Sequence, residues 1–83
     1  FAKLTETQRQ AVYRSLRLNE EIFQKLSESA DRIERDGNPS MAASFRKSAD
    51  DSRRKALDKL RARHGINEDQ LEDIRREGKE RGW

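Results

Sequence analysis

Apolar side chains recur at alternating steps of three and four residues along the first third of the chain. The series contains Val12, Leu16, Phe23, Leu26, Ala30 and Ile33, and the polar Asn19 falls within it. This spacing keeps one stripe of an α-helix facing a partner. Thr5 and Gln8 have the spacing of a capping box, and Gly37 can close a helix in the left-handed conformation. The pattern predicts a helix over about 6–36.

A break within this first helix is the alternative. Asn19, followed by Glu20 and Glu21, also has the character of a helix start, because Asn is favoured at the N-cap. The same segment then forms two helices that meet near Leu18. The unbroken helix agrees better with the continuous stripe.

A second periodic segment follows Asn38 and Pro39, which offer a cap and a first-turn residue. Its stripe contains Met41, Phe45, Ala49, Ser52, Ala56 and Leu60. The small residues in the middle of the stripe are expected to let another helix approach closely. This segment predicts a helix over about 39–63, and the short turn before it makes the two long helices antiparallel.

A third, shorter helix is predicted over about 68–77. Asn67 and Gln70 repeat the capping-box spacing, and Leu71 and Ile74 supply an apolar face. Gly78 is expected to end this helix and to leave residues 79–83 as a tail. The predicted fold is therefore all-α: one small helical domain over residues 1–83, made of an antiparallel helical hairpin of two long helices plus a short third helix.

Composition makes the expected core thin. Of the 83 residues, 42% are charged and 31% hydrophobic, and below ~70–80 residues a lone core rarely supplies more than about 3–5 kcal/mol. Leu18 and Ile22 lie beside the main stripe and widen its apolar surface. We therefore expect two hairpins to pack as a homodimeric helix bundle, with coiled-coil-like contacts. A monomeric three-helix bundle, capped by the third helix and Trp83, is the alternative.

Eight residues on the two long stripes are the expected core and interface. They are Val12, Leu16, Phe23, Leu26, Phe45, Ala49, Ala56 and Leu60. If Phe45 is buried among them, its replacement by Ala costs about 3–5 kcal/mol.

The composition also excludes most catalytic chemistry. With no Cys and one His, the chain has no disulfide, thiolate nucleophile or Cys-ligated zinc. His64 precedes Gly65 at a predicted helix end, where an imidazolium meets the helix dipole favourably. We therefore predict no enzyme activity, and no catalytic, metal-ligating or cofactor-binding residue. The expected function is that of a non-catalytic helical interaction or oligomerisation module, which binds another copy of itself and then another protein.

Nucleic-acid binding by the second helix is the alternative function. Residues 38–65 contain eight basic and three acidic side chains. The candidate anion-binding residues are Arg53, Arg54, Lys55, Lys59, Arg61 and Arg63. Against this function, they are spread around the helix, and Asp50 and Asp51 precede Arg54 and Lys55 by four residues, the spacing of intrahelical ion pairs.

Long apolar segments are absent from the sequence. No uninterrupted apolar run exceeds three residues, so neither a membrane span nor a signal peptide is predicted. The expectation is a soluble cytoplasmic protein with no membrane partner.

Overall fold

A computed structural model describes residues 3–83 of the chain. This part contains three α-helices and no strand: α1 (Glu6–Arg35), α2 (Pro39–His64) and α3 (Glu68–Arg81). The all-helical class predicted from the sequence is confirmed. Within residues 3–83, none of the helices has both the length and the apolar character needed to cross a bilayer.

The start of α1 has the reciprocal hydrogen bonds of a capping box. The backbone N–H of Gln8 donates to Thr5 Oγ1 at 3.2 Å, and the backbone N–H of Thr5 donates to Gln8 Oε1 at 2.8 Å. These bonds satisfy two donors that a helix start otherwise leaves unpaired. The helix then continues without interruption through Asn19, so the alternative of two helices that meet near Leu18 is wrong.

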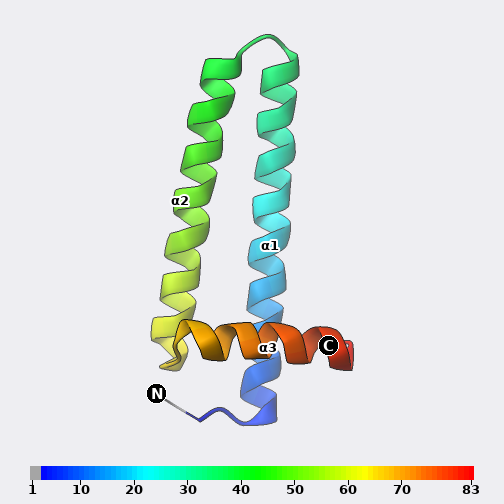
Figure 1. The fold of residues 1–83 in the computed structure, drawn as a ribbon, viewed down its shortest axis with the longest axis vertical. Helices are drawn as coiled ribbons and strands as arrows, with labels where there is room; N and C mark the ends of the chain where they lie inside the picture. Colours follow the sequence, from blue (N-terminus) through cyan, green and yellow to red (C-terminus); the bar gives the residue numbers. More distant parts are fainter. Residues whose placement is uncertain (1–2) are drawn as a thin grey trace.

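The two long helices lie side by side and run in opposite directions (Figure 1). They are joined by a turn in which Gly37 has a φ of 87°, a conformation that glycine adopts without a Cβ penalty. α3 crosses this pair at the end farthest from the turn, on one side only, and packs mainly against α1. The molecule is elongated, with dimensions of 48 × 25 × 15 Å.

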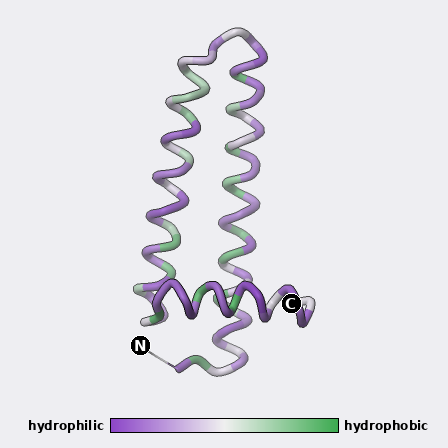
Figure 2. Tube along the Cα trace, in the orientation of Figure 1, coloured by the Kyte–Doolittle hydropathy of each residue, from purple (hydrophilic) through white to green (hydrophobic). Residues whose placement is uncertain are grey.

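The hydrophobic core lies at the end where α3 crosses. Its buried members come from all three helices and the loop before α3: Val12, Tyr13, Leu16, Leu60, Ile66, Leu71 and Ile74. Hydrophobic positions also recur farther along α1 and α2 toward the turn, where only these two helices are present (Figure 2). The half of the molecule near the turn therefore has two helices in contact but no third layer.

The predicted end of the third helix at Gly78 is wrong. α3 continues to Arg81, and Gly82, with a φ of 68°, forms its C-cap. Gly78 is buried inside the helix, where an added Cβ would lie 2.3 Å from Cδ2 of Tyr13. The glycine thus serves the close approach of two helices rather than a helix end, which the local sequence alone does not reveal. The added turn brings Trp83 back against Tyr13, edge-on, with ring centroids 6.1 Å apart.

The predicted stripe of α2 also departs from its expected position. Met41 remains 56% exposed, Ser52 is exposed, and Ala42 is fully buried in their place. A step of four residues advances 400°, or about 40° beyond a full turn. Successive steps of four from Ala49 back to Met41 therefore carry the stripe away from α1.

Candidate interaction surface

The structure places the eight expected core residues in two groups. Val12, Leu16, Ala49 and Leu60 are buried, and Phe23, Leu26, Phe45 and Ala56 are half-buried. α3 crosses only the end of the α1–α2 pair that is farthest from the turn, so most of the length of the pair has no third helix over it (Figure 1).

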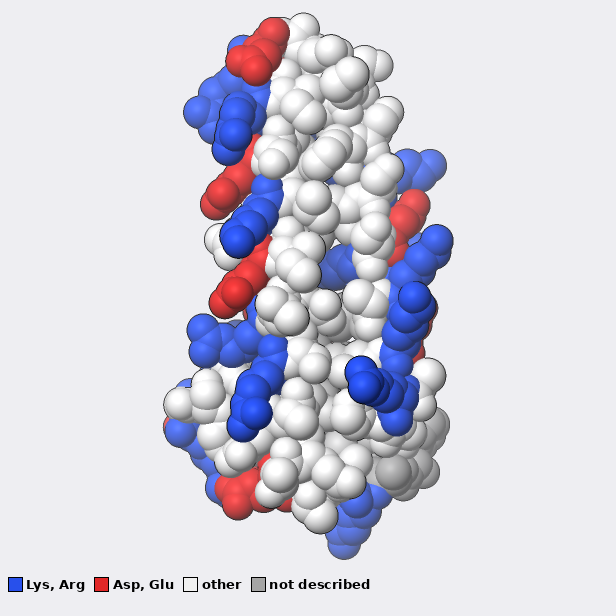
Figure 3. Space-filling model, turned by 180° about the vertical axis from the view of Figure 1, so that it is seen from behind, with Lys and Arg blue, Asp and Glu red and all other residues white. Residues whose placement is uncertain are grey.

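One long side of the molecule carries an uncovered apolar surface. A mostly uncharged band, with some Lys or Arg atoms visible within it, runs along the side opposite α3, between two margins that carry Lys, Arg, Asp and Glu (Figure 3). Leu18 and Ile22 are 58% and 50% exposed. Tyr13 contacts α3, and Ile22 follows it by nine residues. Nine residues turn the helix through about 900°, so Ile22 lies on the side of α1 opposite Tyr13.

Met41 and Phe45 precede Ser52, which lines a cavity together with Ile22, by about three and two helical turns and so lie on the same side of α2. Leu18, Ile22, Leu26, Met41 and Phe45 are called the apolar face below.

Two cavities follow the groove between α1 and α2 on this side. A cavity of about 60 Å³ is lined by Ile22 and Leu26 from α1 and by small residues of α2. A second, of about 280 Å³, lies between Leu18 and the α2 residues Ala56, Lys59 and Arg63. The small α2 residues are Ala49, Ser52 and Ala56. They leave space beside the larger α1 side chains instead of filling it.

The six candidate anion-binding residues do not form one cluster. The Arg53 guanidinium lies 4.7 Å from the centroid of the Phe23 ring, and Arg61 pairs with Asp58 and Glu68. Among the described residues, Arg54, Lys55, Lys59 and Arg63 have no ion-pair partner, so the expected pairs of Arg54 and Lys55 with Asp50 and Asp51 do not form. Lys59 and Arg63 share a cavity with Leu18, and Arg53 shares the smaller cavity with Ile22 and Leu26.

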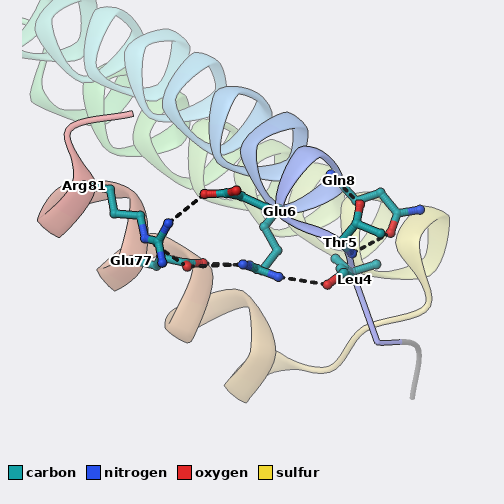
Figure 4. A network of polar contacts seen from close by, with 7 residues as sticks. Leu4, Thr5, Glu6, Gln8, Glu77 and Arg81 are labelled. Carbon is teal, nitrogen blue, oxygen red and sulfur yellow. Dashed lines mark hydrogen bonds and ion pairs between the residues drawn. The ribbon is translucent and has the colours of Figure 1, made fainter.

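A polar network between α1 and α3 was not anticipated from the sequence. Arg9 donates from Nε to Glu77 Oε1 at 2.7 Å and from Nη1 to the Leu4 carbonyl at 2.9 Å. Arg81 pairs with Glu6 at 2.6 Å and with Glu77 at 3.3 Å (Figure 4). Arg9 and Glu77 are 68 positions apart, so no local spacing could have indicated the pair.

This network shifts the ionisation of its members. The hydrogen bond from Arg9 holds the pKa of Glu77 below its ordinary value, and the charges of Arg9 and Arg81 act in the same direction against partial burial. The same hydrogen bond raises the pKa of Arg9. A cavity of about 440 Å³ lies beside the network, but Arg9 and Glu77 already satisfy each other. The network therefore holds α3 on α1 and offers no unpaired reactive group.

A metal site would need a group of ligating side chains within the described residues. Within residues 3–83, no group of three or more His, Asp or Glu side chains is placed to hold a metal ion. His64 is half-buried at the last position of α2, beside the left-handed Gly65. No protein-family model, curated protein or solved structure matches this chain. The apolar face contains Leu18, Ile22 and Met41, the exposed large hydrophobic residues of the described part of the chain.

Proposed function

We propose that this protein is a non-catalytic helical association module that binds a second copy of itself through the apolar face. The observation that carries the proposal is the mostly uncharged band opposite α3, where Leu18, Ile22 and Met41 are each at least half exposed. Contiguous exposed apolar surface of this kind marks interaction sites in proteins. The described helical pair is, in this proposal, half of a four-helix bundle.

The length of the molecule favours the proposed interface. The apolar face includes residues of both long helices in a molecule that is 48 Å long. The main buried cluster lies at the α3 end, and the buried residues nearer the turn are alanines such as Ala30 and Ala42. A second copy on the other side would supply a further layer for the half-buried residues near the turn. Such completion is how two helical hairpins form a bundle.

Oligomeric state tests the proposal directly. Light scattering and sedimentation from low micromolar to submillimolar concentration are expected to give the mass of a dimer for the wild type. Ile22→Glu is expected to give a monomer, because a charged carboxylate is costly to bury in an apolar interface. Leu18→Lys is expected to give the same result, because it adds a third cation beside Lys59 and Arg63. Retained helical circular dichroism shows that the variants still fold.

Gln24→Glu is the matched control for these variants. Gln24 is exposed on the same helix and lies about 200° around α1 from Ile22, so the added charge stays outside the apolar face. The control is expected to remain a dimer. A wild-type chain that is a monomer at every concentration would sink the proposal.

One observation favours nucleic-acid binding as a second candidate function. Lys55, Lys59 and Arg63 recur at steps of four on α2, and all three lack ion-pair partners in residues 3–83. Such a row can follow a phosphate backbone. A mobility shift that weakens steeply with salt, and that is lost when all three are replaced by Gln, supports this candidate. Absence of binding even at low salt rejects it.

A further inference from the structure

One neutral polar residue, Asn19, lies in the groove on the apolar side of the molecule. It lines both cavities there, the one of about 60 Å³ together with Ile22 and the one of about 280 Å³ together with Leu18. Leu16 precedes Asn19 by three residues and Phe23 follows it by four, so the three share one side of α1. Asn19 is half-buried. An amide therefore interrupts an otherwise apolar row of α1 side chains.

The Asn19 side chain has unused hydrogen-bonding capacity. Its amide offers two N–H donors and a carbonyl oxygen that accepts. Within residues 3–83, no other residue forms a hydrogen bond with it. A serine hydroxyl can instead donate to the carbonyl four residues earlier in its own helix, as Ser29 does to Lys25 at 3.1 Å. In the single chain, water is the partner open to the exposed part of the Asn19 amide.

The cations of the groove differ from Asn19 in their reach. Arg53, Lys59 and Arg63 line the two cavities, but long cationic side chains can keep their charged groups in water while their methylenes cover apolar surface. Their mutual repulsion weakens association at low salt. Asn19 has a single methylene before its amide, so the amide stays in the groove when a second copy covers it. Its bonds to water are then lost.

Asn19 lies close to the twofold axis of a dimer in which the two apolar faces cover each other along their length. The axis either follows the groove or crosses it at the middle. Asn19 is in the groove, beside the small α2 residues Ser52 and Ala56, and it is near the middle of α1 (Glu6–Arg35). A residue close to a twofold axis meets its own counterpart. For both directions of the axis, Asn19 therefore faces Asn19 of the second copy.

Two facing Asn side chains satisfy each other. Each amide donates an N–H to the carbonyl oxygen of the other, which replaces bonds to water that the interface excludes. A slide of one helical turn displaces one copy by about 5.4 Å and takes the two amides out of hydrogen-bond range. Burial of an unpaired amide is costly. The pair thus favours one alignment of the two copies over displaced ones.

Resting on the proposed self-association, we infer that the Asn19 side chains of two copies hydrogen-bond to each other across the twofold axis and thereby restrict the assembly to a dimer with one alignment. A single Asn within the apolar stripe of a coiled coil acts in the same way: it fixes the register and the number of helices at a cost in stability. Asn19 is therefore a specificity-determining residue of the apolar face rather than a source of affinity.

Disulfide cross-linking tests the contact between the two copies. The chain has no Cys, so Asn19→Cys introduces one thiol per copy, and a disulfide forms only where two Cα atoms come within about 7 Å. Mild oxidation is expected to convert this variant to a covalent dimer on a non-reducing gel. Gln24→Cys is the matched control, because Gln24 is exposed on the same helix but lies about 140° around it from Asn19. The control is expected to remain uncross-linked.

Sedimentation velocity of Asn19→Leu tests the restriction to a dimer. Removal of the amide is expected to raise the association constant about tenfold and to add species larger than a dimer. Gln24→Leu adds the same side chain outside the apolar face and is expected to match the wild type.

The outcomes separate failure of the contact from failure of the association. A wild type with dimer mass whose Asn19→Cys variant does not cross-link overturns the Asn19 pair and leaves the self-association intact. An Asn19→Leu variant that forms a weaker dimer, or a single dimer species at every concentration, overturns the restriction. A wild type that is a monomer at every concentration overturns the self-association and this inference with it.

Discussion

At the scale of single residues, the contact between Gly78 and Tyr13 sets how closely α3 approaches α1. The Tyr13 ring is buried between Gly78 and the edge-on Trp83 ring. A methyl group at position 78 would lie 2.3 to 2.6 Å from three ring atoms, closer than carbon atoms can pack. Either the ring or the whole of α3 has to move to admit it.

Gly78→Ala is therefore expected to destabilise the protein by about 1–2 kcal/mol. Overpacking costs ~1–3 kcal/mol, which outweighs the up to about 1 kcal/mol that Ala gains over Gly in a helix. Urea denaturation measures the change, and Glu80→Ala, at an exposed position of α3, is the control. In a Tyr13→Ala background the same substitution is expected to be neutral or stabilising. An equal loss in both backgrounds contradicts the contact.

The degree of burial also ranks two core residues. Leu16 is 1% exposed, so Leu16→Ala is expected to cost about 2–5 kcal/mol. Phe45 is only half-buried, and Phe45→Ala is expected to cost less than ~2 kcal/mol, below the ~3–5 typical of a buried Phe. The comparison is made in the Ile22→Glu background, so that association does not contribute. A larger loss for Phe45→Ala than for Leu16→Ala contradicts the described packing.

At the scale of the elements, α3 is held by apolar contacts and by the Arg9–Glu77 and Arg81–Glu6 pairs. Because folding lowers the pKa of Glu77, its ionised form contributes stability at neutral pH. That contribution begins to fall below the ordinary glutamate value of 4.5 and disappears as the pH passes through the lowered pKa. Acid therefore loosens α3 before it affects the apolar core.

Glu77→Gln is expected to lower the urea midpoint at neutral pH, with a difference from wild type that shrinks as the pH falls below 4.5. Circular dichroism at neutral and acidic pH measures both midpoints. Glu80→Gln serves as control, because Glu80 takes part in no ion pair within residues 3–83. A wild-type advantage over Glu77→Gln that persists unchanged in strong acid argues against the charge pair as its source.

At the scale of the whole molecule, α3 covers only one side of the long α1–α2 pair. The core is concentrated under α3, and the opposite side retains Leu18, Ile22 and Met41 in solvent. The proposed self-association would bury these three side chains against a second copy.

Several features of the fold were accessible from the sequence because they depend on neighbours within four positions. The capping boxes at Thr5 and Asn67 form as predicted. Gly65 ends α2 in the left-handed conformation, and the helix itself extends to His64. The sequence predicted the candidate interaction surface only in part: it identified Leu18 and Ile22 as apolar residues beside the main stripe of the first helix. The drift of Met41 out of the stripe and the scatter of the six cations required the actual orientation of α2 around its axis.

By itself, the sequence determined the all-helical class and the start of each helix, because hydrogen-bond capping and the 3.6-residue repeat act over a single turn. Only the tertiary structure decided where α3 ends, which side of the long pair it covers and which apolar residues remain exposed. Those features depend on contacts such as Tyr13 with Gly78 and Arg9 with Glu77, which join residues more than sixty positions apart. Local sequence patterns do not encode contacts between residues so far apart in the chain. These contacts depend on how the helices pack together.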